Sequence, residues 1–235
     1  MNNRYVKKIK NKQPDNIDVI ILAAGIGSKI KSYEPRSLIK LNNKTLIEHQ
    51  MDAFKQKLPK CDFITVVGYE CNKIIRKIQG KTRIVENCIY NECNNGESLR
   101  LGVNNSLSDN LFIIHGDINF DKSIIDDFTY GESFVITVNG LEEREVGITS
   151  TDGYINSFSY GLEKKWGQIV FLNSTDVEVL RKLLLRNDFN TKFMLTFEIL
   201  NKLIESGVRF KEIEVDTKKV KEIDTAKDII NEYFN

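Results

Sequence analysis

The segment AAGIGS, residues 23–28, has small or flexible side chains at five of its six positions. Glycine lets backbone N–H groups approach a ligand closely, and clustered N–H groups bind anions. Lys29 and Arg36 follow the segment and would add two full positive charges. A polyphosphate is the natural ligand for such a loop. Taken alone, the glycines fit a second interpretation equally well, namely a tight turn where a strand packs against a helix.

Two common glycine-rich motifs do not describe this loop. The dinucleotide-binding fingerprint needs Gly or Ala at position 30 and a helix that starts at once, but position 30 is Ile and Pro35 follows soon after. A P-loop needs Gly-Lys followed by Ser or Thr, which this loop lacks.

Carboxylates at two places in the chain suit a metal ion. Asp117 ends the apolar run LFIIHGD, and the sequence Glu222-Ile223-Asp224 lies near the C-terminus. If that second segment is extended, Glu222 and Asp224 point the same way. Mg²⁺ prefers carboxylate, phosphate and water oxygens. The residues alone leave structural roles open, because Asp117 also suits a turn and Asp224 also suits a helix N-cap.

Polar and aromatic side chains elsewhere could contact a nucleotide or its partner substrate. Asn94, Asn95 and Ser98 lie at the start of a predicted helix, where they can bind a pyrimidine or ribose, or form a turn and a cap. Trp166 and Tyr160 can stack on a base or enclose a quaternary amine, or pack in a core or lid.

Strands and helices alternate in the first half of the chain. Nearly continuous apolar runs predict buried strands at 17–24, 62–69, 82–87 and 111–117. Helical spacing predicts helices at 45–58, with Thr45 as N-cap, at 72–79 and at 96–107. The alternation predicts an α/β fold, a Rossmann-like three-layer α/β/α arrangement with a mostly parallel, mixed central sheet. Ligands bind beyond the carboxyl ends of strands in such sheets, and the glycine loop and Asp117 both fall there.

The second half predicts strands in quick succession and then helices. The strands are expected at 133–140, 145–160 and 167–172, with turns at Asn139-Gly140 and Asp152-Gly153. Helices are expected at 175–186 and 192–206, followed by a strand near 209–215 and a closing helix at 225–234. Residues 1–16 are expected to be a flexible basic lead-in, and residues 17–235 a single domain.

Composition excludes several classes of partner. Lys and Arg total 34 and Asp and Glu total 33, a formal net charge of +1, which gives no broad attraction to nucleic acid or to an anionic membrane. The four cysteines fit neither a zinc ribbon nor a redox Cys-x-x-Cys motif. The N-terminus is polar, unlike a secretory signal, and no apolar run is long enough to cross a bilayer. We therefore expect a cytoplasmic protein.

Several blocks of the sequence resemble the nucleotidyltransferases that build nucleotide-sugars and CDP-alcohols. LAAGIGSKI and EPRSLIKLNNKTLIEHQ, at 22–30 and 34–50, resemble that family's signature LAAGxG[TS]R[ML] followed by PK-x-L. Ser28 is similar to the phosphocholine cytidylyltransferase branch. Further similar blocks occur in the family's order: VVGY (66–69), IVENCIYNECNNGESLRLG (84–102), HGDINF (115–120) and VKEIDTAKDI (220–229).

The resemblance implies an Mg²⁺-dependent enzyme that transfers an NMP group, CMP in this branch, from an NTP to a small phosphorylated acceptor. Phosphocholine-like phospho-alcohols or phosphonates are the expected acceptors, and pyrophosphate is released. Residues 17–130 would bind the nucleotide, and residues 131–235 would bind the acceptor and complete the metal site. The implied nucleotide-binding residues are Leu22, Ala23, Ala24, Gly25, Gly27, Ser28, Lys29, Asn94, Asn95 and Ser98.

The resemblance also implies catalytic roles for Lys29, Arg36 and Asp117, and metal ligation by Asp117, Glu222 and Asp224. The sequence departs from the family at two of these positions, because the family's loop arginine is Lys29 here and its PK lysine is Arg36. Guanidinium and ammonium groups differ in shape and in the geometry of their donors.

Three other functions remain open at this point. The acceptor could be a sugar 1-phosphate, which would give an NDP-sugar. The Lys29/Arg36 exchange could leave a nucleotide-binding module with weakened catalysis. A metal-dependent glycosyltransferase is disfavoured, because its usual Asp-x-Asp appears here only as Asp117-Ile118-Asn119. The oligomeric state is not predicted by the sequence.

Overall fold

The computed structural model describes residues 14–26, 34–128, 130–140, 145–162, 164–185, 189–223 and residue 228. The predictions for Gly27, Ser28, Lys29 and Asp224 lie outside these residues. So do most of the predicted lead-in and nearly all of the predicted closing helix.

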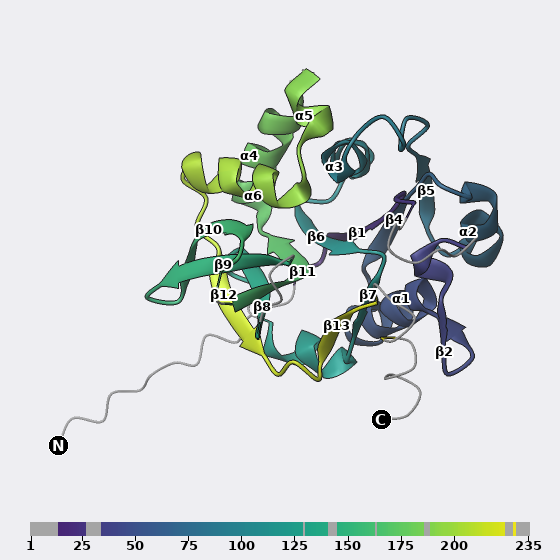
Figure 1. Ribbon diagram of the computed structural model, residues 1–235, viewed down its shortest axis with the longest axis horizontal. Helices are drawn as coiled ribbons and strands as arrows, with labels where there is room; N and C mark the ends of the chain where they lie inside the picture. The colour runs from purple at the N-terminus through teal and green to yellow at the C-terminus, as the bar shows by residue number, and fades with distance from the viewer. Residues whose placement is uncertain are drawn as a thin grey trace.

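A nine-stranded mixed sheet forms the centre of the fold (Figure 1). Its order is β5-β4-β1-β6-β11-β8-β12-β10-β9. Strands β5, β4, β1 and β6 are parallel, as are β8 and β12, whereas β11, β10 and β9 pair antiparallel. The strands are β1 (Ile17–Ala23), β4 (Asp62–Val67), β5 (Arg83–Glu86), β6 (Asn110–His115), β8 (Phe134–Asn139), β9 (Val146–Thr151), β10 (Tyr154–Tyr160), β11 (Lys164–Leu172) and β12 (Lys211–Val215).

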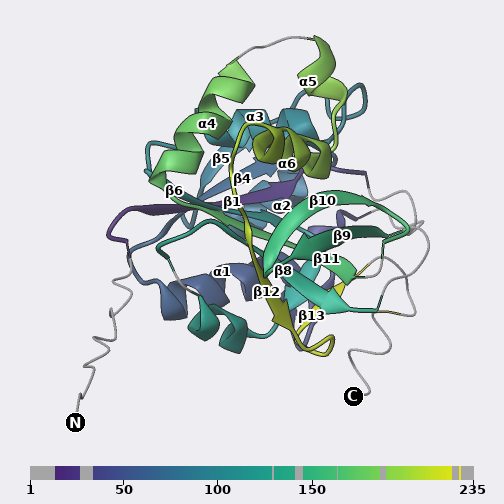
Figure 2. The same ribbon diagram turned by 90° about the vertical axis from the view of Figure 1, so that its left-hand side faces the viewer.

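Helices cover both faces of this sheet (Figures 1 and 2). The first face carries α1 (Leu46–Lys57), α2 (Cys71–Ile78) and the 3₁₀ helix η2 (Lys122–Asp127). The second face carries α3 (Asn95–Asn104), α4 (Ser174–Leu185) and α6 (Thr196–Glu205). In β1, Val19 and Ile21 pack on the first face and Ile20 and Leu22 on the second, which explains why its sequence is apolar at every position except Asp18. The predicted three-layer α/β/α fold is confirmed.

The described residues also form one small hairpin, a second two-stranded sheet and two short helices. The hairpin β2 (Lys40–Leu41) with β3 (Lys44–Thr45) turns at Asn42-Asn43, where both residues have positive φ. Strands β7 (Ile118–Phe120) and β13 (Val220–Glu222) pair antiparallel. The short helices are η1 (Arg36–Leu38) and α5 (Phe189–Phe193).

The predicted helix at 192–206 is wrong as a single element, because α5 ends at Phe193 and α6 begins at Thr196. The extended residues between them contact the start of α3, where the Gly96 amide donates to the Met194 carbonyl. The predicted turn at Asp152-Gly153 is confirmed by positive φ at both residues. Gly140 also has positive φ, but β8 and β9 are not paired across that turn.

Pairing of β7 with β13 brings the C-terminal part of the chain beside the end of β6. Glu222 lies opposite Ile118, and the Ile223 amide donates to the Asp117 carbonyl at 2.9 Å. Gly116 lets β6 approach β1 at this point. Its amide donates to the Leu22 carbonyl, and a Cβ there would lie 3.1 Å from that oxygen. The ends of β1 and β6 and the segment at 220–223 therefore meet at one edge of the sheet.

Candidate active site

A cavity of about 410 Å³ opens at the carboxyl ends of β1 and β6. It adjoins a second cavity of about 380 Å³, and both are lined in part by Arg36, Asn95, His115, Asp117 and Leu195. The remaining residues around the first cavity are Leu22, Ala23, Ala24, Gly25, Pro35, Ser37, Asn87, Tyr90, Cys93, Asn94, Ser98 and Gly116. The described residues that the sequence predicts for nucleotide binding therefore line one cavity.

The end of β1 presents backbone rather than bulky side chains to this cavity. The Ala24 carbonyl accepts from the Tyr69 amide at 3.0 Å, which fixes the chain beyond the strand. Among the described residues, no atom lies within 4 Å of a Cβ built on Gly25, and the φ of Gly25 is not in the left-handed region. Neither the described neighbours nor the backbone conformation requires glycine at this position. This observation favours close approach of a ligand over the interpretation as a simple packing turn.

Arg36 pairs with Asp117 across the cavity. Arg36 lies on η1, directly after Pro35, and its Nη1 is 2.9 Å from Asp117 Oδ2 and 3.9 Å from Glu222 Oε1. The other oxygen of Asp117, Oδ1, is buried and has no hydrogen-bond partner among the described residues. The structure therefore brings together three predicted site residues from segments far apart in the sequence, and it leaves one buried carboxylate oxygen available to a ligand.

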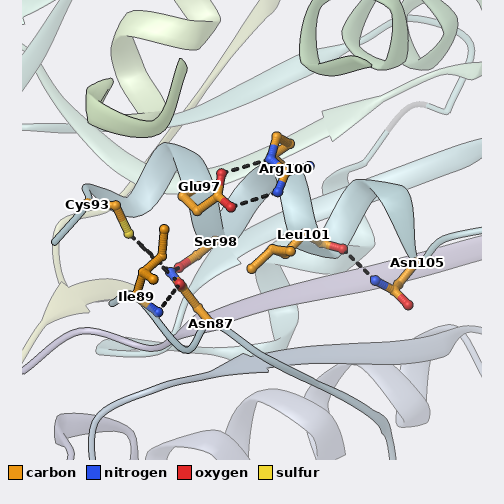
Figure 3. Close-up of polar contacts among 8 residues, drawn as sticks. All are labelled: Asn87, Ile89, Cys93, Glu97, Ser98, Arg100, Leu101 and Asn105. Atoms are coloured by element: carbon orange, nitrogen blue, oxygen red, sulfur yellow. Dashed lines mark hydrogen bonds and ion pairs between the residues drawn. The ribbon is translucent and has the colours of Figure 1, made fainter. Parts of the chain in front are cut away.

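The start of α3 forms the opposite wall. Asn87, which is buried, donates from Nδ2 to Ser98 Oγ at 3.1 Å and to Cys93 Sγ at 3.4 Å, and its Oδ1 accepts from the Ile89 amide (Figure 3). Because the Ser98 hydroxyl oxygen accepts the bond from Asn87, the hydroxyl hydrogen points in another direction and can be donated to a ligand. On the same helix, Glu97 and Arg100 on either side of Ser98 form a two-bond ion pair at 2.7 Å (Figure 3).

The side-chain amides of Asn94 and Asn95 already form hydrogen bonds with other segments of the protein. Asn94 donates from its side chain to the Phe193 carbonyl, and Asn95 Oδ1 accepts from the Thr196 amide at 2.7 Å. These bonds attach the segment between α5 and α6 to the start of α3. The nucleotide-binding role of the two amides stays a prediction, and their structural role is established by these contacts.

The second cavity combines charged and aromatic side chains. Lys165 pairs with Glu145 and lies 3.7 Å from Glu222, which also accepts from Gln168 Nε2 at 2.7 Å. A bulge in β11 places Gln168 at φ 56°, a left-handed conformation that is uncommon for this residue type. Strained residues of this kind cluster at functional sites.

Trp166 and Tyr160, which the sequence suggests as stacking groups, both line this second cavity. The Trp166 ring is only 3% exposed and contacts His115 and Phe158 in edge-to-face geometry. Tyr160 is 52% exposed and packs edge-on against Phe197. Trp166 is thus mainly a packing group, and Tyr160 leaves much of its ring accessible.

His115 lies between the two cavities, at the end of β6. Burial lowers its pKa below the usual value, and the positive charge of Arg36 adds to this effect, although Asp117 and a hydrogen bond with Gln168 oppose it. The imidazole is therefore neutral at pH 7, and its Nε2 is buried without a hydrogen-bond partner.

Sequence reasoning missed several residues that line the cavities. Asn87 and Ser37 line the first, and Lys165 and Gln168 line the second. Asn87 is the last residue of the predicted strand at 82–87, so the rule that ligands bind at the carboxyl ends of strands, which located Asp117, could also have found Asn87. Lys165 and Gln168 depend on the bulge in β11, which has no clear signal in the sequence.

Asp117 provides a carboxylate oxygen of the kind that binds a divalent cation. Within the described ranges, no group of three or more His, Cys, Asp or Glu side chains is arranged to hold a metal ion. Mg²⁺ needs no such group, because one or two carboxylates commonly hold it together with phosphate and water oxygens. The unpartnered Oδ1 of Asp117 fits that mode of binding.

Comparison with known proteins gives a family match over the first half of the chain. A family model described as the MobA-like NTP transferase domain matches residues 19–132. Those residues contain β1 from Val19 onward, the loop beyond it, Arg36, the start of α3 and Asp117. The match therefore includes every described residue that lines the first cavity except Leu195.

Curated relatives and a solved structure extend the comparison. The chain is 28% identical over 151 residues to the bifunctional protein GlmU of Methanococcus maripaludis, covering 63% of this chain and 36% of the relative. It is 33% identical over 122 residues to choline-phosphate cytidylyltransferase of Streptococcus pneumoniae, covering 50% of this chain and 52% of the relative. The chain thus spans between about a third and a half of the length of these two relatives.

The fold is similar to that of the CTP:phosphocholine cytidylyltransferase structure from Streptococcus pneumoniae. The TM-score is 0.78 at 22% identity, and the match covers 92% of this chain and 97% of that one. Within the described ranges, every helix is too short or too polar to cross a lipid bilayer.

Proposed function

We propose that this chain, whose residues 19–132 match the family model of the MobA-like NTP transferase domain, transfers an NMP group from an NTP to a small phosphorylated acceptor. An acceptor phosphate or phosphonate oxygen attacks the α-phosphorus, the bond to the β-phosphate oxygen breaks, and pyrophosphate leaves. Residues 17–130 bind the nucleotide, and residues 131–235 bind the acceptor. The reaction needs alignment and charge stabilisation rather than a protein nucleophile.

The observation that carries the proposal is the first cavity, where Gly25, Arg36, Asp117 and the start of α3 meet. A triphosphate carries several negative charges, and it would find the backbone around Gly25, the guanidinium of Arg36 and the positive end of the α3 dipole there. Within the part of the chain that the structure describes, nothing packs against Gly25 closely enough to require glycine, and this further supports a close ligand.

Arg36 would stabilise the charge that develops during transfer. Its guanidinium already lies at the cavity wall and carries donors beyond the one that contacts Asp117. A phosphate oxygen could therefore accept from Arg36 while the contact with Asp117 persists. Lys29, in the adjoining loop, is the second proposed cation.

Mg²⁺ is the proposed cofactor, with Asp117 as its main protein ligand. When bound, the ion would neutralise negative charge on the triphosphate. Glu222 lies within reach of the same region but is already in contact with Gln168 and Lys165, so we assign it a secondary role. Asp224 remains a proposed ligand.

CTP is the proposed donor. The choline-phosphate cytidylyltransferase relative supports this choice, as do the polar groups of Asn87 and Ser98 on the cavity wall. Ala23 and Ala24 are buried where a larger purine would need more room. We expect CTP to be preferred over UTP, and both over ATP and GTP.

A pyrophosphate-release screen tests the proposal. Four NTPs would be combined with phospho-alcohols, phosphonates and sugar 1-phosphates in the presence of Mg²⁺. Asp117→Asn should abolish release, while Asp52→Asn, the same change at an exposed ion pair with Lys44, should not. Absence of pyrophosphate with every pair would refute catalysis and leave the alternative of a nucleotide-binding module.

A further inference from the structure

Gln168 has a backbone conformation that its residue type does not favour. Its φ of 56° lies in the left-handed region, which glycine adopts readily and which costs other residues free energy. The residue belongs to the bulge in β11, where the register with β8 shifts between Trp166 and Val170. A bulge turns a side chain in a new direction. Glycine would relieve the strain here, so the amide side chain of Gln168 contributes something that glycine cannot.

This side chain connects β11 to Glu222. Gln168 Nε2 donates to Glu222 Oε2 at 2.7 Å, and the same side chain forms a hydrogen bond with His115 at the end of β6. The backbone of Glu222 is held by the pairing of β13 with β7, where Glu222 lies opposite Ile118. The last torsion of a glutamate side chain has a broad range of values. The bond from Gln168 restricts that torsion.

The carboxylate of Glu222 lies between two cations. Its Oε1 is 3.9 Å from Arg36 Nη1, and its Oε2 is 3.7 Å from Lys165 Nζ. Both distances exceed the range of about 2.7–3.2 Å for an N–H···O hydrogen bond, whereas the bond from Gln168 lies within it. Attraction at the longer distances depends little on the direction of the carboxylate. Gln168 therefore orients the carboxylate, which turns one oxygen toward each cation.

The two cations belong to different halves of the proposed site. Arg36 lines both cavities and is proposed to contact the triphosphate, whereas Lys165 lines the second cavity, in the half proposed for the acceptor. The transfer brings two anionic phosphates together, so the positive charges beside them need a fixed spacing. Arginine and lysine side chains have many rotamers, and a shared anion restricts them.

We infer that Gln168 is a positioning residue for the proposed transfer, because it orients the Glu222 carboxylate between two cations. That carboxylate holds Arg36 and Lys165 at the spacing that the two phosphates need. The inference rests on the proposed function and adds to it how the two halves of the site are aligned. Neither Gln168 nor Glu222 touches the reacting atoms.

Four variants test the inference. Gln168→Gly removes the amide and permits the same backbone conformation. Glu222→Gln keeps the shape of the side chain and removes its charge, and the double variant completes a cycle. Asn43→Gly is the matched control, because Asn43 is an exposed amide residue with φ 68° in the turn between β2 and β3. Pyrophosphate release with the best NTP and acceptor pair gives kcat and KM, and calorimetry gives the Kd of α,β-methylene CTP.

Gln168→Gly should lower kcat by about ten- to a hundred-fold, the range expected for misaligned reacting groups. The Kd of α,β-methylene CTP should stay the same, because Arg36 keeps its contact with Asp117. Glu222→Gln should lower kcat at least as much. The double variant should lower kcat no further than Glu222→Gln alone, since Gln168 acts through the charge of Glu222. Asn43→Gly should change neither kcat nor Kd.

Three results would overturn the inference. The first is an unchanged kcat in Gln168→Gly. The second is a loss of nucleotide affinity as large as the loss of kcat, which is the pattern of a purely structural role. The third is additive losses in the double variant, which would show that Gln168 does not act through Glu222.

Thermal unfolding provides a measurement that needs no turnover. Gln168→Gly should lower the Tm more in the wild type than in Glu222→Gln, because a charged acceptor strengthens the bond from the amide. Equal decreases in the two backgrounds would contradict the orientation of Glu222 by Gln168. If the wild type releases no pyrophosphate, the proposed reaction is refuted, and this comparison of Tm values decides whether Gln168 orients Glu222.

Discussion

Removal of Arg36 should make the protein depend on a divalent cation for part of its stability. In the wild type, Arg36 provides the nearby positive charge for Asp117, whose side chain is only 11% exposed. Arg36→Ala leaves the largely buried Asp117 carboxylate without the guanidinium that contacts its Oδ2, while its Oδ1 already lacks a hydrogen-bond partner among the described residues. A cation that binds there replaces the missing charge.

The magnitude follows from the geometry of the pair. A hydrogen bond to a charged group contributes about 1.5–3 kcal/mol when it is largely sheltered from water. Arg36 is 24% exposed, so we expect a loss of free energy of unfolding in the lower half of that range, about 1.5–2 kcal/mol. For a chain of this size, that corresponds to a decrease in Tm of roughly 3–8 °C.

Thermal unfolding with increasing Mg²⁺, in the absence of nucleotide, measures this effect. Mg²⁺ should raise the Tm of Arg36→Ala more than that of the wild type, because the carboxylate has no competing cation. The additional increase should disappear in the double variant Arg36→Ala with Asp117→Asn. Equal increases in all three proteins would refute both the pairing argument and the assignment of Asp117 as a metal ligand.

Three further predictions concern other parts of the structure. Burial raises the pKa of Glu48, but hydrogen bonds from the amide and hydroxyl of Thr45 and the ion pair with Lys77 outweigh burial and lower that pKa to about 2. Glu48→Gln should therefore lower the free energy of unfolding, measured in urea, by about 1–2 kcal/mol above pH 5. The difference from the wild type should shrink as the pH falls toward 2, because Glu48 then becomes protonated. Gly116→Ala should lower the affinity for nucleotide, measured by calorimetry, because the added Cβ would displace the end of β1. Gly131→Ala is the control and should leave that affinity unchanged, because no described atom lies within 4 Å of a Cβ there. Exchanging the two cations, Lys29→Arg with Arg36→Lys, should lower kcat/KM at least ten-fold, and unchanged or improved turnover would contradict the role given to Arg36.

The strands and helices with strong periodicity could be predicted from the sequence. The run IDVIILAA must be buried on both faces, and β1 is buried throughout. Thr45, the predicted N-cap, is the N-cap of α1. The residues within each of these elements determine its structure, so these elements can be predicted from the sequence alone.

Elements fixed by distant contacts could not be predicted. The break between α5 and α6 depends on bonds from the start of α3, about 100 residues away in sequence. Strands β7 and β13 have three residues each and form only because they pair with each other. The family resemblance placed Glu222 in the same site as Arg36, but the local sequence of either segment does not indicate the strand pairing that brings them together.

The same long-range geometry explains why an arginine suits position 36. Its guanidinium lies 2.9 Å from Asp117 and 3.9 Å from Glu222, so one planar group links the end of β6 to β13. An ammonium group is a compact charge on a flexible stem, and it could not hold both carboxylates in one fixed plane and also donate to a phosphate. Glu222 in turn contacts Gln168 and Lys165 in the second cavity. Arg36 therefore joins the proposed nucleotide site to the proposed acceptor site through charged side chains, and a lysine at this position would weaken that connection even though the total charge is unchanged.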